Sequence, residues 1–313
     1  MPHLTTSPFR LMQLPFYIVD VFAEKQYEGN QLAVFEHDGS ISSETMLAIA
    51  QEINFAETTF INTKTSTPDG YDVRIFTPEQ EIPFAGHPTL GTAFVIQQEL
   101  LKQPVSQVVL NLKVGKISVD FAGETLWMQQ INPIFGQLFP KKEVAEFLHI
   151  SENDVLDFPL LEVSTGLNAL MVPVKNLAVM QKIKADFEAF NAFLLRNQRH
   201  RSNSPSGVAM SCFVFCKETY SPNNALNARM FWHAGDKIIE DSATGSANGA
   251  FLGYSLKTNF FGKDSIQMSV EQGYEIPRPS ILYHDGHKIS EDQYSIRIGG
   301  KTQWVSKGIW FTN

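Results

Sequence analysis

Two stretches of this chain are built to the same plan, and no other feature of the sequence constrains the fold as strongly. The first reads VRIFTPEQEIPFAGHPTLGTAF over residues 73–94, and the second reads ARMFWHAGDKIIEDSATGSANGAFL over residues 228–252. Each begins with Arg, an aliphatic residue and Phe in a strand-like run. Each then passes through an acidic loop and continues from a small residue plus Gly into a helical run. A chance match is the alternative, because the span from the Arg to the Gly that opens the helix is four residues longer in the second stretch. We interpret the pair as an internal duplication.

The length of the chain and its pattern of apolar residues favour two domains rich in strands. At 313 residues the chain exceeds one comfortable hydrophobic core. In the first half we expect a hairpin of residues 16–22 and 30–36, a helix over 42–54 with Ser43 as N-cap, strands over 57–63 and 71–78, a helix over 86–102, and a meander of strands over 107–130. After a crossover at 131–140, we expect helices over 141–148, 176–199 and 245–257, with strands between them.

Charge and composition exclude several classes of protein. The chain has 33 acidic and 25 basic residues and a net charge of −8, whereas a general nucleic-acid binder carries a basic surplus. No apolar run reaches the roughly 20 residues of a membrane span. The first 15 residues lack the pattern of a signal peptide, so we expect a short disordered lead-in there. We therefore expect a cytoplasmic protein that binds neither nucleic acid nor membrane.

The cysteines and histidines do not form a metal-binding pattern. Cys212 and Cys216 lie on one face of a strand-like run, too far apart to form a disulfide with each other. We expect them to be core residues. His284 and His287 flank Asp285-Gly286, a pair typical of a turn. No metal site is predicted.

The duplicated stretches each open a helix with Gly, at Gly86 and Gly245. A helix N-terminus presents unpaired N–H groups and partial positive charge, which suit an anion. His87 and Ser246 add a side-chain donor to each end. Two such ends facing a shared cleft would bind a small carboxylate between the domains. The alternative is two ordinary capped helices, with EDSATG as an N-cap loop.

Proton transfer needs a titratable group, and Glu57 is the candidate. It lies in NFAETTF, where the first helix turns into a strand beside Phe55, Ala56 and Phe60. A carboxylate in apolar surroundings has its pKa raised by desolvation and exchanges protons near neutrality. The alternative is a surface glutamate at a turn.

Five motifs run in order along the chain from about residue 16: GNQLAVF (29–35), NFAETTF (54–60), RIFTPEQEIPFAGHPTLGTA (74–93), EDSATGSANGA (240–250) and EQGYEIPRPS (271–280). Together they resemble the PhzF-like proteins of phenazine biosynthesis, in the diaminopimelate-epimerase-like superfamily. The chain departs from the family at Gln31, where Pro is usual after Gly-Asn. We expect this change to alter a turn beside the cleft.

The resemblance implies an α/β (α+β) fold of two pseudo-symmetric domains, each a curved sheet or barrel around a central helix, with the active site between them. The N-terminal domain would span residues 16–130 and the C-terminal domain residues 131–301. The last strand, about 302–313, would rejoin the first domain. The family also implies a homodimer.

The function implied by the resemblance is a cofactor-independent isomerase that moves a proton on a small unsaturated or cyclic carboxylic acid. Glu57 would be the proton shuttle, while His87 and Asp241 would place and polarise the substrate. The residues expected to bind the substrate are Asn30, Gly86, Gly245 and Ser246. Neither a cofactor nor a metal ion is implied.

Racemases of the superfamily carry a Cys before each of those glycines, and this chain has Ala85 and Thr244 instead. Stereoinversion needs a base on one face of the substrate and an acid on the other, and Ala85 is neither. A hydrogen shift on one face needs only Glu57. Two alternatives stay open: an epimerase or dehydratase that uses Glu57 with Asp241, and a catalytically silent binding protein with the same fold.

Overall fold

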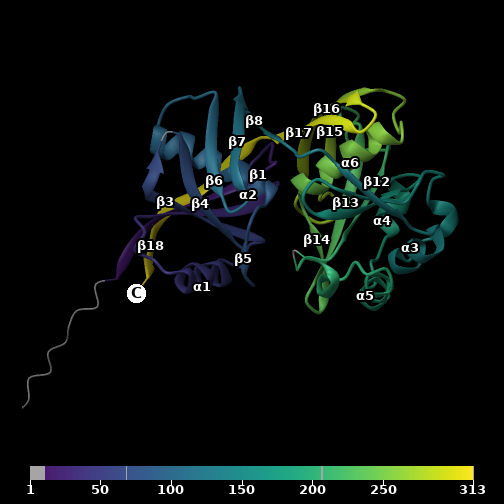
Figure 1. Ribbon diagram of the computed structural model, residues 1–313, viewed down its shortest axis with the longest axis horizontal. Coiled ribbons are helices and arrows are strands. Elements are labelled where there is room, and N and C mark those ends of the chain that lie inside the picture. Colours follow the sequence, from purple (N-terminus) through teal and green to yellow (C-terminus); the bar gives the residue numbers. More distant parts are fainter. Residues whose placement is uncertain (1–10, 68, 206, 313) are drawn as a thin grey trace, which may run out of the picture.

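The computed structural model describes residues 11–67, 69–205 and 207–312. Figure 1 shows two lobes side by side, the first built from the N-terminal half of the chain and the second from most of the C-terminal half. All strands among the described residues belong to one continuous sheet of 18 strands. The two lobes are joined in this sheet by antiparallel pairing of one strand from each.

The first lobe holds the elements up to residue 129 together with the last strand. These are β1 (Met12–Val21), β2 (Asn30–His37), α1 (Ser43–Ile53), β3 (Glu57–Thr67), β4 (Gly70–Phe76), β5 (Glu81–Ile82), α2 (Gly86–Val95), the π-helical turn η1 (Ile96–Leu101), β6 (Gln107–Leu112), β7 (Gly115–Ala122), β8 (Thr125–Gln129) and β18 (Thr302–Thr312). In Figure 1 the yellow strand β18 returns through this lobe.

The second lobe holds the remaining elements. These are β9 (Ile134–Leu138), α3 (Lys141–Leu148), the 3₁₀ turn η2 (Glu152–Asp154), β10 (Leu161–Ser164), β11 (Asn168–Pro173), α4 (Leu177–Lys182), α5 (Phe187–Arg196), the 3₁₀ turn η3 (Arg201–Asn203), β12 (Ser211–Cys216), β13 (Leu226–Ala234), β14 (Lys237–Asp241), α6 (Gly245–Lys257), β15 (Ser265–Gln272), β16 (Ser280–Ser290) and β17 (Gln293–Gly300).

The two lobes have the same strand topology. In the first, β1 pairs antiparallel with β2, β2 runs parallel to β3, β3 pairs antiparallel with β4, and β4 runs parallel to β6. In the second, β10, β11, β12, β13 and β15 repeat these relations in the same order. The outermost pairings correspond too, since β18 pairs with β1 and β9 with β10. This repetition supports the duplication inferred from the sequence.

The duplication extends to individual ion pairs. Arg74 on β4 contacts both carboxylate oxygens of Glu81, with N–O distances of 2.9 and 2.8 Å. Arg229 on β13 contacts Glu240 in the same way, at 2.8 and 2.6 Å. Each glutamate precedes the glycine that opens the helix by five residues. The two pairs therefore occupy equivalent positions in the two lobes.

Each lobe encloses one central helix that is buried on almost all sides. In α2 every residue but Phe94 is buried, and in α6 only Ser246 and Lys257 are not. A helix that is apolar all round belongs inside a core, not on a surface. The core around α2 continues into the second lobe through residues of α6, β15, β16 and β17. The predicted fold class is confirmed, while the boundary at residue 130 stays a prediction.

Several predictions of local structure were wrong in instructive ways. Ser42, not Ser43, caps α1, since its hydroxyl accepts a bond from the Thr45 amide. The crossover at 131–140 contains strand β9, which pairs with β10. The helix expected over 176–199 is two helices, because Asp186 caps a new helix start. The expected lead-in is partly strand from Met12 onward, and residues 1–10 lie outside the described residues.

The HDGH sequence is not a turn but the middle of the long strand β16. Gly286 has ordinary extended backbone there, and a Cβ would lie only 2.8 Å from Leu252 Cδ2 of α6. The glycine therefore allows the central helix to approach the sheet closely.

Cys212 and Cys216 are free and fully buried, as expected, and burial raises the pKa of both thiols. Among the described residues, no helix has the length and apolar character needed to cross a membrane.

Candidate active site

The first turns of α2 and α6 meet at the junction of the two lobes. A Cβ placed on Gly86 would lie 3.4 Å from the Gly245 Cα, and one placed on Gly245 would lie 3.6 Å from the Gly86 Cα. The amide nitrogen of Ser246 would be 3.7 Å from the Gly86 Cβ. The two glycines thus let two helix N-termini approach each other with backbone alone between them.

Neither of these helix starts is capped by a side chain. The N-cap residues are Ala85 and Thr244, and neither accepts a bond from the first turn. The Thr244 hydroxyl instead donates to Asp241 Oδ2 and accepts from Gln272 Nε2. The interpretation as two ordinary capped helices is therefore wrong. Two uncapped N-termini concentrate unpaired N–H groups and partial positive charge in one place, which is an arrangement suited to an anion.

Glu57 and His87 face each other beside these helix starts. Glu57 is the first residue of β3 and His87 the second of α2, and Glu57 Oε2 lies 3.3 Å from His87 Nε2. Both side chains are largely buried, 17% and 6% exposed, and neither of these two atoms has a well-aligned hydrogen bond. Two buried polar atoms without a proper partner mark a place where a ligand could supply one.

Burial moves the pKa of both groups toward their neutral forms. It raises the pKa of Glu57 from 4.5 to about 8, and the charge of Asp241 adds to this rise. It lowers the pKa of His87 from 6.5 to about 3, against a backbone hydrogen bond at Gln31. At pH 7 the imidazole is therefore neutral, and the carboxyl group exchanges protons within about one pH unit of neutrality.

Gln31 itself lies in strand β2 opposite Asp20, and the expected change in a turn beside the cleft stays a prediction. Its side chain is exposed. A hydrogen bond that raises an imidazole pKa favours the charged form, so the ring N–H donates to the Gln31 carbonyl. Proline has that carbonyl too. The contact to His87 is therefore possible both with Gln31 and with the proline that is usual in the family.

Asp241 ends β14 and joins the site from the second lobe. Its Oδ1 accepts a hydrogen bond of 2.8 Å from Asn30 Nδ2 in the first lobe, and the same amide group reaches the Ala243 carbonyl at 3.0 Å. Burial raises the pKa of Asp241 from 3.8 to about 6, while the bonds from Thr244 and Asn30 act in the opposite direction. Asp241 is thus mostly ionised at pH 7, next to a mostly protonated Glu57.

The structure brings every predicted site residue into one region, with contacts linking Glu57 to His87, Asn30 to Asp241, and Gly86 to Gly245 and Ser246. Sequence reasoning missed the apolar neighbours. The Phe22 ring would be 3.5 Å from a Cβ on Gly245, and the Met128 methyl group 3.6 Å from one on Gly86. No sequence signal pointed to either residue. Among the described residues, no cluster of three or more His, Cys, Asp or Glu side chains could hold a metal ion.

Comparison with known proteins identifies the family and the fold of the chain. The family model of the phenazine biosynthesis-like proteins, PhzC-PhzF, matches residues 19–308. A trans-2,3-dihydro-3-hydroxyanthranilate isomerase from Pseudomonas chlororaphis is 28% identical over 299 residues, covering 94% of this chain and 98% of the relative. The crystal structure of a PhzF-family protein from Bacillus anthracis has a TM-score of 0.84 at 26% identity, with 96% of this chain and 99% of that one covered.

A more distant likeness concerns the fold alone. A hydroxyproline epimerase from Agrobacterium vitis has a TM-score of 0.56 at 12% identity, over 96% of this chain and 92% of that chain. The chain therefore has a two-lobed fold that it shares with this epimerase. The chain belongs to the phenazine biosynthesis-like family. It is a PhzF-like isomerase.

Proposed function

We propose that the protein is a cofactor-independent isomerase that moves a proton on a small unsaturated or cyclic carboxylic acid bound between the lobes. The substrate carboxylate would lie at the N-termini of α2 and α6, near the amides of Gly86, Gly245 and Ser246. Partial positive charge at two uncapped helix ends would balance its negative charge. The first candidate substrate is trans-2,3-dihydro-3-hydroxyanthranilate, the compound in the name of the Pseudomonas chlororaphis relative.

The observation that carries the proposal is the place of Glu57, a largely buried carboxyl group whose Oε2 lies 3.3 Å from His87 Nε2 beside the two helix starts. Its ionised form would remove a proton from a saturated ring carbon, breaking the C–H bond, and the electron pair would move into the adjacent double bonds. The protonated Glu57 would then return the proton at the far end of that system, forming a new C–H bond. A general base works best with a pKa near the working pH, and burial raises the pKa of Glu57 to about 8.

His87 and Asp241 would position the substrate without taking its proton. His87 is neutral at pH 7, so it would act as a hydrogen-bond partner for Glu57 or a substrate hydroxyl group. The mostly ionised Asp241 would accept a hydrogen bond from a substrate hydroxyl or amino group. Both roles would hold the reacting carbon near Glu57, and such positioning contributes strongly to rate.

The positions before the helix glycines argue against cysteine-type racemisation. Ala85 has no functional group, and the Thr244 hydroxyl already binds Asp241 and Gln272. The two cysteines lie in the core of the second lobe. With proton transfer assigned to Glu57 alone, the shift would occur on one face of the substrate.

The test is turnover of trans-2,3-dihydro-3-hydroxyanthranilate in D₂O, followed by NMR. We expect isomerised product, with deuterium at one carbon and on one face only. Loss of configuration at a carbon would instead favour an epimerase, and release of water from the substrate would favour a dehydratase. Binding without turnover for any small carboxylate in a thermal-shift screen would support a catalytically silent protein.

The remaining expectations belong to the same proposal. We propose a homodimer in the cytoplasm that works without a cofactor and has no nucleic-acid or membrane partner. Light scattering at micromolar concentration tests the oligomeric state. A mass corresponding to one 35.1 kDa chain would contradict the dimer.

A further inference from the structure

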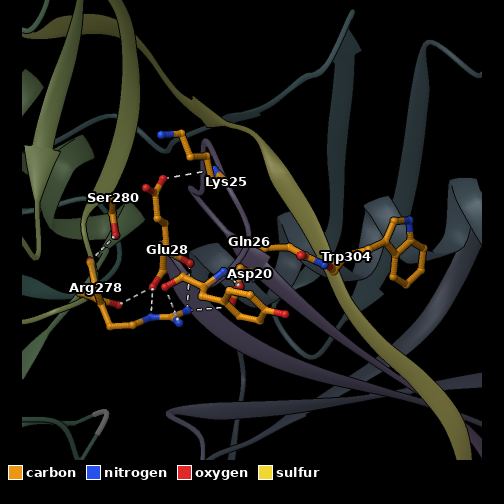
Figure 2. A network of polar contacts seen from close by, with 10 residues as sticks. Asp20, Lys25, Gln26, Glu28, Arg278, Ser280 and Trp304 are labelled. Carbon is orange, nitrogen blue, oxygen red and sulfur yellow. Dashed lines mark hydrogen bonds and ion pairs between the residues drawn. The ribbon is translucent and has the colours of Figure 1, made fainter.

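Arg278 connects the second lobe to the first through four hydrogen bonds. It lies between β15 and β16, and Figure 2 shows its guanidinium group inside a bend of the first lobe. Nε donates to the Gly29 carbonyl at 3.0 Å and Nη1 to the Tyr27 carbonyl at 2.9 Å. Nη2 donates to the Glu28 carbonyl at 2.9 Å and to Asp20 Oδ1 at 2.6 Å. One side chain thus binds three successive carbonyl groups and a carboxylate.

The carboxylate in this network is almost completely buried. The Asp20 side chain is 2% exposed and that of Arg278 is 23% exposed. The second Asp20 oxygen accepts a bond of 2.7 Å from the Tyr27 amide. A buried carboxylate is costly unless it is paired and hydrogen-bonded, and the planar fork of Arg suits several acceptors at once. The network therefore holds the backbone of 27–29 in one conformation.

That segment leads directly into the candidate site. The amide of Gly29 donates to the Pro279 carbonyl at 2.8 Å, and the Gly29 carbonyl accepts from both Arg278 and Ser242 Oγ. Gly29 has a φ of +72°, and a Cβ there would lie 2.3 Å from the Val21 carbonyl oxygen. The next residue is Asn30, whose amide group binds Asp241 and the Ala243 carbonyl. Arg278 is thus linked to Asp241 by two hydrogen bonds and the peptide bond between Gly29 and Asn30.

We propose that Arg278 is a positioning residue that holds Asn30, and through it Asp241, in place across the boundary between the lobes. The expected effect of Arg278 on turnover rests on the proposed function. The expected effect on the positions of Asn30 and Asp241 does not depend on any substrate. Arg278 would not touch the substrate. It would act by fixing the backbone from which Asn30 projects.

The chain contains a matched ion pair that lacks this connection. Arg199 binds Glu162 through both carboxylate oxygens at 2.8 and 2.9 Å. The exposures are similar to those of the Arg278 pair, 29% for Arg199 and 5% for Glu162. Both partners belong to the second lobe, and among the described residues the hydrogen bonds of their side chains go to residues outside the candidate site. Arg199→Lys therefore serves as the control for loss of a buried, forked ion pair.

The first experiment needs no substrate. The pKa of the Asp241 carboxyl group is measured by ¹³C NMR in the wild type, Arg278→Lys and Arg199→Lys. The bond from Asn30 favours the ionised form of Asp241, so its weakening should raise that pKa in Arg278→Lys. We expect no change in Arg199→Lys, although both variants lose stability. An unchanged Asp241 pKa in folded Arg278→Lys would overturn the proposal.

The second experiment measures turnover of trans-2,3-dihydro-3-hydroxyanthranilate in a double-mutant cycle. We expect Arg278→Lys to lower kcat by about 10- to 100-fold, since a small misplacement of positioning groups has effects of this size. In the Asn30→Ala background the same change should have much less effect, because the two residues act in series. Additive effects would overturn the proposal.

Two provisions keep the result interpretable. If Arg278→Lys does not fold, Asp20→Asn replaces it, because it removes the buried charge and leaves one oxygen for two donors. A rise in the Asp241 pKa in that variant supports the proposal, and its absence contradicts it. If the wild type turns over neither this substrate nor any other carboxylate that binds in the thermal-shift screen, the proposed function fails, while the NMR measurement still decides the role of Arg278.

Discussion

At the scale of single residues, Glu57 and Asp241 are carboxyl groups of one site with different surroundings. Asp241 is bound by Asn30 and Thr244, which favour its ionised form and limit the rise of its pKa to about 6. Glu57 has His87 at 3.3 Å and no such donor, and its pKa rises to about 8. Two titratable groups with separated pKa values are a common basis for dividing roles in proton transfer.

Glu57→Gln tests the assignment of the proton shuttle. The amide has nearly the same volume and reach as the carboxyl group, so the fold and carboxylate binding should persist. We expect kcat to fall by about 100- to 10,000-fold, the range typical of general acid–base catalysis. Steady-state kinetics and a thermal-shift titration measure the two properties separately.

His87→Asn is the companion variant for that measurement. It removes a contact used by both bound substrate and transition state, so binding and turnover should weaken together. Turnover of Glu57→Gln within a few-fold of the wild type would remove Glu57 as the shuttle and direct attention to Asp241.

The raised pKa of Glu57 also predicts how stability depends on pH. The folded state keeps the proton up to about pH 8, whereas the unfolded chain releases it near 4.5. The stabilisation from this proton is therefore complete below pH 4.5 and is lost as the pH rises through 8. Between these values the wild type should lose stability relative to Glu57→Gln, by at most about 1.4 kcal/mol per pH unit.

Urea unfolding of both proteins at pH 5 and pH 8.5 measures this difference. Asp241 titrates in both proteins and so largely cancels from the comparison. A stability difference that is the same at both pH values would mean that Glu57 is not protonated in the folded state at neutral pH.

At the scale of elements, the two central helices are equivalent in position but differ in how they meet the sheet. In the first lobe the hydroxyl groups of Thr59 on β3 and Thr92 on α2 form a buried hydrogen bond of 2.8 Å. The equivalent residues in the second lobe are Phe213 on β12 and Phe251 on α6, whose rings are 5.8 Å apart. The same topology thus accepts a polar or an aromatic contact.

The threonine pair gives a prediction about packing. Thr59→Val should destabilise the protein by about 1–3 kcal/mol, because it leaves the Thr92 hydroxyl buried without its partner. Replacing both threonines by Val should recover much of that loss, since no polar group then stays unpaired. Denaturant unfolding of the single and double variants measures the effect. A double variant that loses the sum of both single effects would contradict this account.

At the scale of the whole molecule, the chain closes the first lobe with its last strand, which follows the whole second lobe in the sequence. Strand β18 pairs with β1 from Thr302 to Thr312 and carries Trp310 onto the first-lobe core. The ring of Trp310 lies 5.5 Å from that of Phe35 and 5.9 Å from that of Phe16. The first lobe is therefore complete only when the last residues are in place.

Trp310→Ala should test this closure, with Phe311→Ala as the control on the same strand. Trp310 packs against the core, while Phe311 is 58% exposed. We expect a loss of about 2–4 kcal/mol for the first variant and less than about 0.5 kcal/mol for the second. Hydrogen exchange should increase in β1 of Trp310→Ala more than in β12. Equal effects of the two variants would mean that the strand contributes through its backbone pairing alone.

The sequence by itself determined the features that depend on local spacing. Both Gly-opened helix starts, at Gly86 and Gly245, were predicted from the repeated motif and from the helical run that follows each glycine. The motifs around Glu57, His87 and Asp241 identified the family, and hence the fold, without any knowledge of contacts. The duplication was likewise visible in the sequence.

Only the tertiary structure decided how distant segments meet. Asn30 and Asp241 are 211 positions apart, and their hydrogen bond exists because the lobes pack together. Arg278 binds carbonyl groups at 27–29 for the same reason. Because every residue has a backbone carbonyl group, the sequence does not show which of them accept a hydrogen bond. HDGH reads as a turn locally, yet close packing against α6 makes it a strand. Burial, a property of the whole fold, likewise decided the pKa values of Glu57 and His87.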